Sequence, residues 1–312
     1  MPDPLLELLA LETLCLCEAA PVIAAPPAIA DPVEDLLAHA TTSGSALVIR
    51  ICRPAVKRLL AGSVNSIGRI KLTQHAGHFL TDAEFRELFH ELTAVVATSH
   101  LLGRSLLADQ AERVRKRKGR VQESRLLEGL TPLAPLDAID FFRNLIPTLG
   151  TDPLRQLPDY RRTAFTLAVA TEKTLLQSVQ DAIADLLGSG KAAEGPAAIS
   201  AILDAAEVSP RNSGYAEMVW RTNAMDAYHQ GWQDQMQEEQ ETFPVWRYSN
   251  PHDSRSRPSH AARNGLYYPA SVPFVVVRGT GIEDAARCRC VPIAIDKWAW
   301  SKLQAQGVRL AA

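Results

Sequence analysis

The spacing of apolar residues predicts long helices over much of the chain before residue 240. Apolar side chains recur every three to four positions, which places them along one face of a helix. The segments interpreted as helices are residues 45–61, 82–118, 159–187, 195–210 and 213–240. We therefore expect a core built mainly by helices that pack along their apolar faces.

The predicted helix at 82–118 has the clearest start. Thr81 occupies the cap position and Glu84 follows three residues later. Each of these side chains can therefore accept a hydrogen bond from the backbone N–H of the other residue. The helix at 159–187 has the clearest end, because Gly188 and Gly190 suit the left-handed conformation that closes helices.

A different pattern begins after Thr242. Three short segments are rich in β-branched and aromatic residues and are bounded by Pro or Gly, namely residues 243–249, 272–279 and 290–295. Such segments are typical of strands and predict a small sheet of about three strands. The predicted fold class is α+β, mainly α-helical, with long helices followed by this small carboxyl-terminal β region.

Turn-forming residues suggest how the chain divides. An amino-terminal helical region, 1–120, precedes a connector, 121–134, that contains the sequence TPLAP. The main region, 135–296, opens with a short helix between Pro135 and Pro147 and includes the predicted sheet. Residues 297–312 form a short tail.

Composition restricts the class of protein. With 312 residues, of which 46% are hydrophobic and 22% charged, the chain can bury a sizeable core. The first thirty residues lack a basic start and contain four acidic residues, so they do not fit a secretory leader. No apolar run reaches the ~18 residues of a membrane span. We expect a soluble protein of the cytoplasm with no membrane partner.

One basic run stands out against the formal net charge of −2. It lies near the end of the predicted helix at 82–118 and contains Arg113, Arg115, Lys116, Arg117, Lys118 and Arg120. Basic side chains there complement the negative end of the helix dipole and can simply be solvated. The alternative is that they contact DNA phosphates.

The densest candidate chemistry lies in the sequence HDSRSRPSHAARNG, residues 252–265. Pro258 suits the first position of a helical turn, and Asn264 with Gly265 suits its left-handed end. The sequence PSHAAR therefore predicts one short turn of helix that carries His260. Asp253 is expected to form a salt bridge with Arg255 or Arg257 that braces this loop.

The second candidate is RCRC, residues 287–290, because two cysteines lie two positions apart. An extended backbone sends Cys288 and Cys290 to the same face. Zinc takes four ligands from Cys, His and carboxylate, and His260, Cys288 and Cys290 with Asp253 or His252 would supply them. The alternative to a structural zinc is that the cysteines are small core residues and that His260 hydrogen-bonds to a backbone or carboxylate group.

Other catalytic motifs are missing from the sequence. The chain has no Gly-rich phosphate loop, no Gly-x-Ser-x-Gly elbow, no His-Glu-x-x-His motif and no dinucleotide fingerprint. The remaining enzymatic hypothesis is a zinc-dependent hydrolase of nucleic acid or another phosphate ester. In that hypothesis Asp253 acts as a base and Arg257 as an electrophilic helper beside the zinc.

Three motifs in order give the chain a family resemblance. VWRTNAMDAYHQG at 219–231, DSRSRPSHAARNG at 253–265 and RCRCVPI at 287–293 resemble the phage Mu protein F-like head-morphogenesis family. The resemblance covers roughly residues 135–296. One departure is Arg287, which stands where family members often place an Asn.

The resemblance implies a minor head protein of a phage or prophage, with no established catalytic activity. It implies roles in head assembly, in association with portal and capsid proteins and in handling packaged DNA. The protein would be present in the host cytoplasm during assembly and then in the virion head. The implied structural residues, which would lock the sheet against the long helices, are Arg221, Asn223, Asp253, Arg255, Arg257, His260, Gly265, Cys288 and Cys290.

Overall fold

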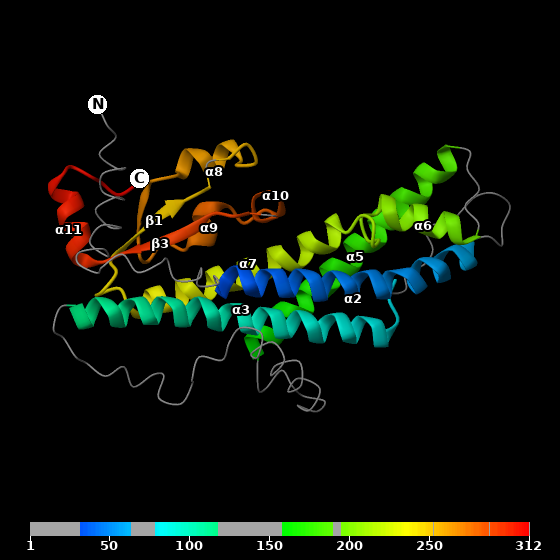
Figure 1. The fold of residues 1–312 in the computed structure, drawn as a ribbon, viewed down its shortest axis with the longest axis horizontal. Helices are drawn as coiled ribbons and strands as arrows, with labels where there is room; N and C mark the ends of the chain where they lie inside the picture. The colour runs from blue at the N-terminus through cyan, green and yellow to red at the C-terminus, as the bar shows by residue number, and fades with distance from the viewer. Residues whose placement is uncertain are drawn as a thin grey trace, which may run out of the picture.

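Long helices dominate the molecule in the computed structural model (Figure 1). The structure describes residues 32–63, 79–117, 158–189, 195–251, 253–286 and 288–311. The helices before the sheet are α2 (Pro32–Ser63), α3 (Asp82–Arg117), α5 (Pro158–Gly188), α6 (Gly195–Ala205) and α7 (Gly214–Glu238). The prediction of long helices followed by a small β region is therefore confirmed.

One apolar core joins all five of these helices. It includes Ile51 from α2, Leu92 from α3, Ile183 from α5, Leu203 from α6 and Trp220 from α7, all nearly inaccessible to solvent. In α3 and α5 the periodic spacing accounts for the residues that enter this core, since it places apolar residues on one face of each helix. Val169 on α5 is an exception, because its side chain is exposed although it fits the periodic pattern.

The longest seam of this bundle runs between α3 and α7. Glycine allows the two backbones to touch: a Cβ on Gly231 would lie 1.9 Å from the carbonyl oxygen of His100. A Cβ on Gly103 would lie 2.2 Å from the carbonyl oxygen of Tyr228. Two polar contacts reinforce the seam: a hydrogen bond between His100 Nε2 and Asp234 Oδ2 at 2.8 Å, and an ion pair between Arg104 and Glu238 at 2.7 Å.

The predicted capping box at the start of α3 is present. The Thr81 N–H donates to Glu84 Oε2 over 2.8 Å, and the Glu84 N–H donates to Thr81 Oγ1 over 3.3 Å. The adjacent Leu80 N–H donates to Glu172 on α5, which ties this end of α3 to the bundle. Helix α2 starts at Pro32 and is thus longer than the predicted segment 45–61.

The carboxyl-terminal lobe lies at one end of the bundle and contains an antiparallel sheet (Figure 1). The strands are β1 (Val245–Ser249), β2 (Tyr267–Pro269) and β3 (Val291–Ile295), in the order β2-β1-β3. In register, Trp246 of β1 faces Tyr268 of β2 and Ala294 of β3. The short helices of the lobe are α8 (Pro258–Arg263), α9 (Phe274–Arg278), α10 (Ile282–Ala285) and α11 (Lys297–Ala305).

The predicted strand at 272–279 is wrong, because residues Phe274–Arg278 form helix α9. The segment instead buries Phe274 against the aromatic rings of Trp246 and Tyr248. The third strand is Tyr267–Pro269, which was not predicted because three residues are too few to show an alternating pattern.

A second core fills the space between the sheet and the long helices. Leu107 of α3 and Trp232 of α7 meet Trp246 and Phe274 of the lobe there. Helices α3 and α7 therefore contribute to both cores. None of the helices within the described ranges combines the length and the apolar character needed to cross a membrane. The predicted connector at 121–134 and helix at 135–147 lie outside the described residues.

Candidate metal centre

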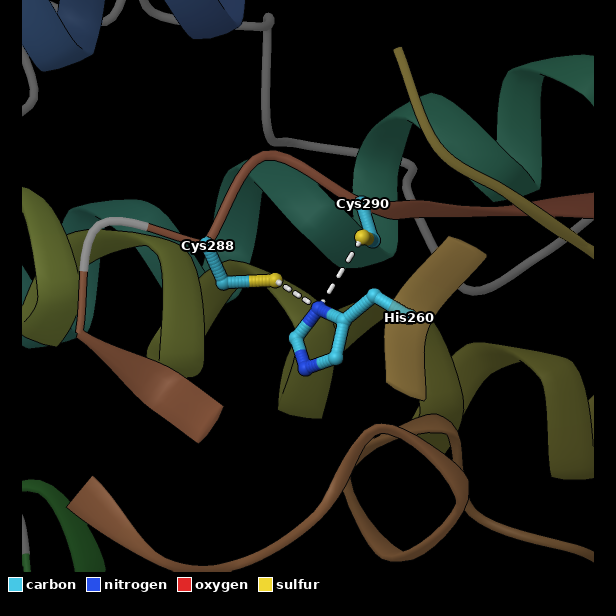
Figure 2. A group of neighbouring side chains, drawn as sticks. All are labelled: His260, Cys288 and Cys290. Carbon is cyan, nitrogen blue, oxygen red and sulfur yellow. Dashed lines mark hydrogen bonds between the residues drawn. The ribbon is translucent and has the colours of Figure 1, made fainter. Parts of the chain in front are cut away.

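Three side chains predicted as metal ligands converge in the lobe (Figure 2). His260 Nδ1 lies 3.3 Å from the Cys290 sulfur and 3.7 Å from the Cys288 sulfur. The ligand atoms of the three residues all lie within 4.8 Å of one another. All three residues are buried, with 2% to 4% of their surfaces exposed.

Local backbone structure explains why these side chains meet. Pro258 opens α8, as its fixed φ angle favours, and places His260 on the buried side of this single turn. After α8 the chain turns through Gly265 at φ +78°, the left-handed conformation predicted from the sequence. The Gly265 N–H then donates to the carbonyl of Tyr248 in β1 over 2.9 Å. The turn thereby fixes α8 beside the sheet.

The two cysteines lie on the chain that leads from α10 into β3. The Cys288 N–H donates to the carbonyl of Ala285 over 3.0 Å, which turns this segment toward the sheet. Both sulfurs face His260. Arg289, between them, turns to Asp253 instead. This alternation is the one expected of extended backbone.

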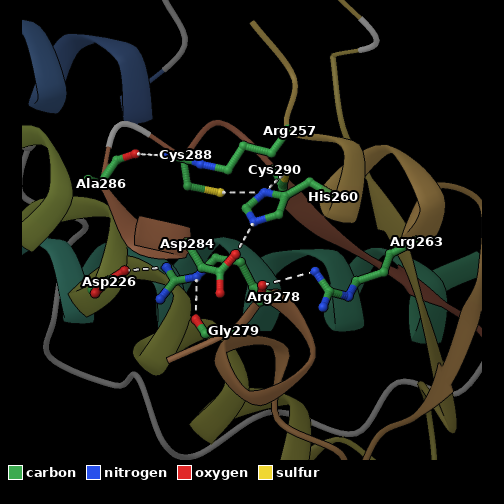
Figure 3. A network of polar contacts seen from close by, with 10 residues as sticks. All are labelled: Asp226, Arg257, His260, Arg263, Arg278, Gly279, Asp284, Ala286, Cys288 and Cys290. Carbon is green, nitrogen blue, oxygen red and sulfur yellow. Dashed lines mark hydrogen bonds and ion pairs between the residues drawn. The ribbon is translucent and has the colours of Figure 1, made fainter. Parts of the chain in front are cut away.

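A carboxylate fixes the orientation of the His260 ring. Asp284 Oδ1 of α10 lies 3.2 Å from Nε2, on the side of the ring away from the sulfurs (Figure 3). A proton on Nε2 satisfies this contact, and the lone pair of Nδ1 then points at the two sulfurs. Asp284 was not predicted from the sequence, because nothing in IEDA distinguishes its carboxylate from that of a solvated residue.

The two thiols affect each other's ionisation. The hydrogen bond from the Cys288 thiol lowers the pKa of Cys290, and this effect outweighs burial, which opposes it. The same contact raises the pKa of Cys288. Burial is the largest influence that raises the pKa of nearby Tyr248, and the Cys290 thiol adds to it. Proton sharing therefore favours a thiolate at Cys290, the form that binds metal ions.

Asp253 lies outside the His260 group. Arg289 binds both of its carboxylate oxygens at 2.6 Å, and Arg255 lies 3.6 Å away. The hydrogen bond from Arg289 is the main reason why the pKa of Asp253 is well below its usual range. Arg257 donates to the carbonyl of Ala286 rather than to Asp253. His252 and Arg287 lie outside the described residues.

A buried arginine network continues from this centre to the long helices (Figure 3). Arg278 of α9 is 2% exposed and forms an ion pair with Asp226 of α7. Its Nε donates to the carbonyl of Gly279 over 3.2 Å, and its own carbonyl accepts a bond from Arg263 of α8. Neither Arg278 nor Asp226 was predicted from the sequence, because the two residues are 52 positions apart.

The remaining predicted residues lie on the long helices. Arg221 and Asn223 are half-buried on α7. In the basic run, Arg115 forms an ion pair with Glu239 and Lys116 with Glu112, and the Arg113 side chain is exposed. Arg117 ends α3, while Lys118 and Arg120 lie beyond the described residues.

A match to a known protein family covers the part of the chain that contains His260, Cys288 and Cys290. Residues 177–293 match the family model described as Phage Mu protein F like protein. This part of the chain is similar to that family. It begins within α5 and ends within β3, so it includes α7, α8 and the cysteines. It falls inside the region 135–296 for which the sequence motifs suggested the same family.

A curated relative extends the comparison. A stretch of 94 residues is 32% identical to the Mu-like prophage FluMu F protein of Haemophilus influenzae. This stretch makes up 30% of the present chain and 22% of that relative. No solved structure matches the chain. Neither match supports the alternative of a zinc-dependent hydrolase. The burial of His260, Cys288 and Cys290 also argues against it, since a substrate must reach a catalytic ion.

Proposed function

We propose that this chain is a minor head protein of a phage or prophage that acts in head morphogenesis and is not an enzyme. The observation that carries the proposal is the match of residues 177–293 to the Mu F-like family. The site geometry is in keeping with it. The polar residues of the motifs bind one another and the backbone, and His260, Cys288 and Cys290 are buried.

The partners in this proposal are the portal and capsid proteins of the same phage. The protein would work in the host cytoplasm while heads assemble and would remain in the finished virion. Support comes from the family match and from the FluMu F relative, whose name places it in a Mu-like prophage.

Deletion of the gene from the phage that encodes it tests this function. We expect induced cells to produce few infectious particles and malformed or unfilled heads in electron micrographs. The wild-type gene supplied in trans should restore both, and mass spectrometry should detect the protein in purified heads. Normal, infectious heads from the deletion, together with the absence of the protein from wild-type virions, would contradict the proposal.

Contact with packaged DNA is a second part of the proposal. Arg113 and Lys116 have exposed side chains at the end of α3, and Lys116 forms an ion pair with Glu112 one turn earlier. Arg115 is less available, because it forms an ion pair with Glu239 on α7. The end of α3 therefore offers two accessible cations for phosphate binding.

Salt-dependent binding to duplex DNA of random sequence tests this part. We expect Arg113→Gln combined with Lys116→Gln to weaken binding and to reduce the slope of log K against log salt by about 2. The matched control is Arg53→Gln with Lys57→Gln, which removes two exposed cations from α2. If the two double variants behave alike, the end of α3 is not the DNA contact.

A further inference from the structure

We infer that His260, Cys288 and Cys290 bind one zinc ion, and that Asp284 positions the imidazole for it. The inference is independent of the proposed head function, because it rests on the geometry of these four residues. It differs from the ligand set expected from the sequence in that Asp253 is not a member.

The distances fit a tetrahedral zinc site. A zinc ion ~2.3 Å from sulfur and ~2.1 Å from nitrogen, with tetrahedral angles, places sulfur and nitrogen about 3.6 Å apart. The two separations between the His260 nitrogen and the cysteine sulfurs are 3.3 Å and 3.7 Å. The three side chains therefore need little movement to bind an ion.

Two sulfurs that converge on one ring nitrogen form the geometry that a shared cation favours. Nδ1 of His260 has a single lone pair when Nε2 carries the proton, so it accepts from one thiol at a time. Two sulfurs nevertheless face it. A cation between the three atoms would attract both sulfurs and the nitrogen at once, and two sulfurs with one imidazole are ligands that zinc prefers.

Asp284 is the kind of hydrogen-bond partner that a zinc-binding histidine usually has. Ligating histidines commonly donate their second N–H to a carboxylate, which fixes the ring and makes it a stronger base. Asp284 Oδ1, 3.2 Å from Nε2, is placed for this role. Within the described ranges no fourth His, Cys, Asp or Glu joins the group, and His252, which the sequence offers as a fourth ligand, lies outside those ranges.

The ion would fasten two segments that the backbone connects only distantly. His260 lies on α8, between β1 and β2, whereas the cysteines are 28 and 30 residues further along and precede β3. Because a bound ion stabilises only the folded arrangement of its ligands, removal of zinc should lower the melting temperature of the lobe.

Metal analysis of the full chain tests the inference. Protein purified without chelators or metal resin should contain about one zinc per chain. His260→Ala and Cys288→Ser should each reduce this content at least tenfold. Cys52→Ser, at a buried cysteine of α2 in the other core, is the control and should keep its zinc. An unchanged zinc content in His260→Ala and Cys288→Ser would place the ion elsewhere and overturn the inference.

Cobalt binding covers the case in which these variants fail to fold. Wild-type protein stripped of metal should bind one Co²⁺ and show the absorption bands of thiolate coordination in a tetrahedral field. Wild-type protein that holds less than about a tenth of an equivalent of zinc and shows no such bands would also overturn the inference. The three residues would then be a hydrogen-bonded cluster.

Two carboxylate variants test the role of Asp284. Asp284→Asn should keep the stoichiometry of one zinc and weaken its affinity about 10- to 100-fold, as measured by competition with a chelator. Asp253→Asn is the matched control, since its carboxylate binds Arg289 and Arg255. Equal losses of affinity in the two variants would remove the positioning role of Asp284.

Discussion

At the scale of single residues, Arg278 shows how this lobe holds a buried charge. Its side chain is 3% exposed, whereas the side chain of its partner Asp226 is 40% exposed. Burial of an ion is costly unless it is paired, and the partner at the surface bears less of this cost. The two members of the ion pair should therefore respond differently to substitution.

We predict that Asp226→Asn destabilises the protein more than Arg278→Met does. The first change leaves a buried guanidinium without its carboxylate and should lower the free energy of unfolding by about 1–3 kcal/mol. The second replaces the buried cation with an apolar side chain of similar length, and water can solvate Asp226. Urea denaturation measures both. A larger loss for Arg278→Met would show that the guanidinium contributes through packing rather than charge.

At the scale of elements, the α3–α7 seam depends on two glycines that let the backbones touch. Gly103 and Gly231 each face a carbonyl of the opposite helix, and neither site has room for a Cβ. Glycine costs a helix about 1 kcal/mol relative to alanine, so its presence here needs a packing reason. Gly231 ends the sequence VWRTNAMDAYHQG at 219–231, and its contact with His100 leaves no room for a side chain at that position.

We predict that Gly231→Ala destabilises the protein although alanine is the better helix former. The added methyl group would lie 1.9 Å from the carbonyl oxygen of His100, so the helices must separate, at a cost of about 1–3 kcal/mol or more. The matched control is Gly188→Ala at the end of α5, where a Cβ meets nothing within 4 Å. Thermal unfolding compares them, and equal melting temperatures would show that the seam adapts without cost.

At the scale of the whole molecule, α3 and α7 join two cores. Leu92 and Trp220 belong to the core of the long helices. Leu107 and Trp232 belong to the second core, with residues of the sheet and α9. The Mu F-like match, residues 177–293, includes α7 but not α3. The matched region therefore shares its apolar surfaces with helices that precede it in the chain.

We predict that residues 195–312 do not fold cooperatively by themselves. Without α3 and α2, the α7 side chains Trp220 and Trp232 would lose much of the surface that covers them. The fragment should bind the dye ANS strongly and unfold over a broad temperature range, unlike the full chain. Co-expression with residues 1–190 should reverse this behaviour. A sharp unfolding transition of the lone fragment would show that the lobe is independent of α3.

Local patterns in the sequence determined much of this architecture. Periodic apolar residues determined α3 and α5, and the reciprocal bonds of Thr81 and Glu84 determined where α3 begins. Pro258 and Gly265 determined the turn that carries His260. These features follow from interactions between residues a few positions apart, which is why the sequence alone was sufficient for them.

The strand order and the partners of the charged groups follow instead from tertiary packing. The valine-rich segment after Pro273 forms α9, which packs Phe274 against Trp246 and Tyr248. Asp253 binds Arg289 more closely than its neighbour Arg255, and Asp284 rather than Asp253 reaches His260. Such choices depend on which distant groups the packed backbone brings within hydrogen-bond distance. The spacing of residues along the sequence does not give these distances, because they are set only when the helices and the sheet pack together.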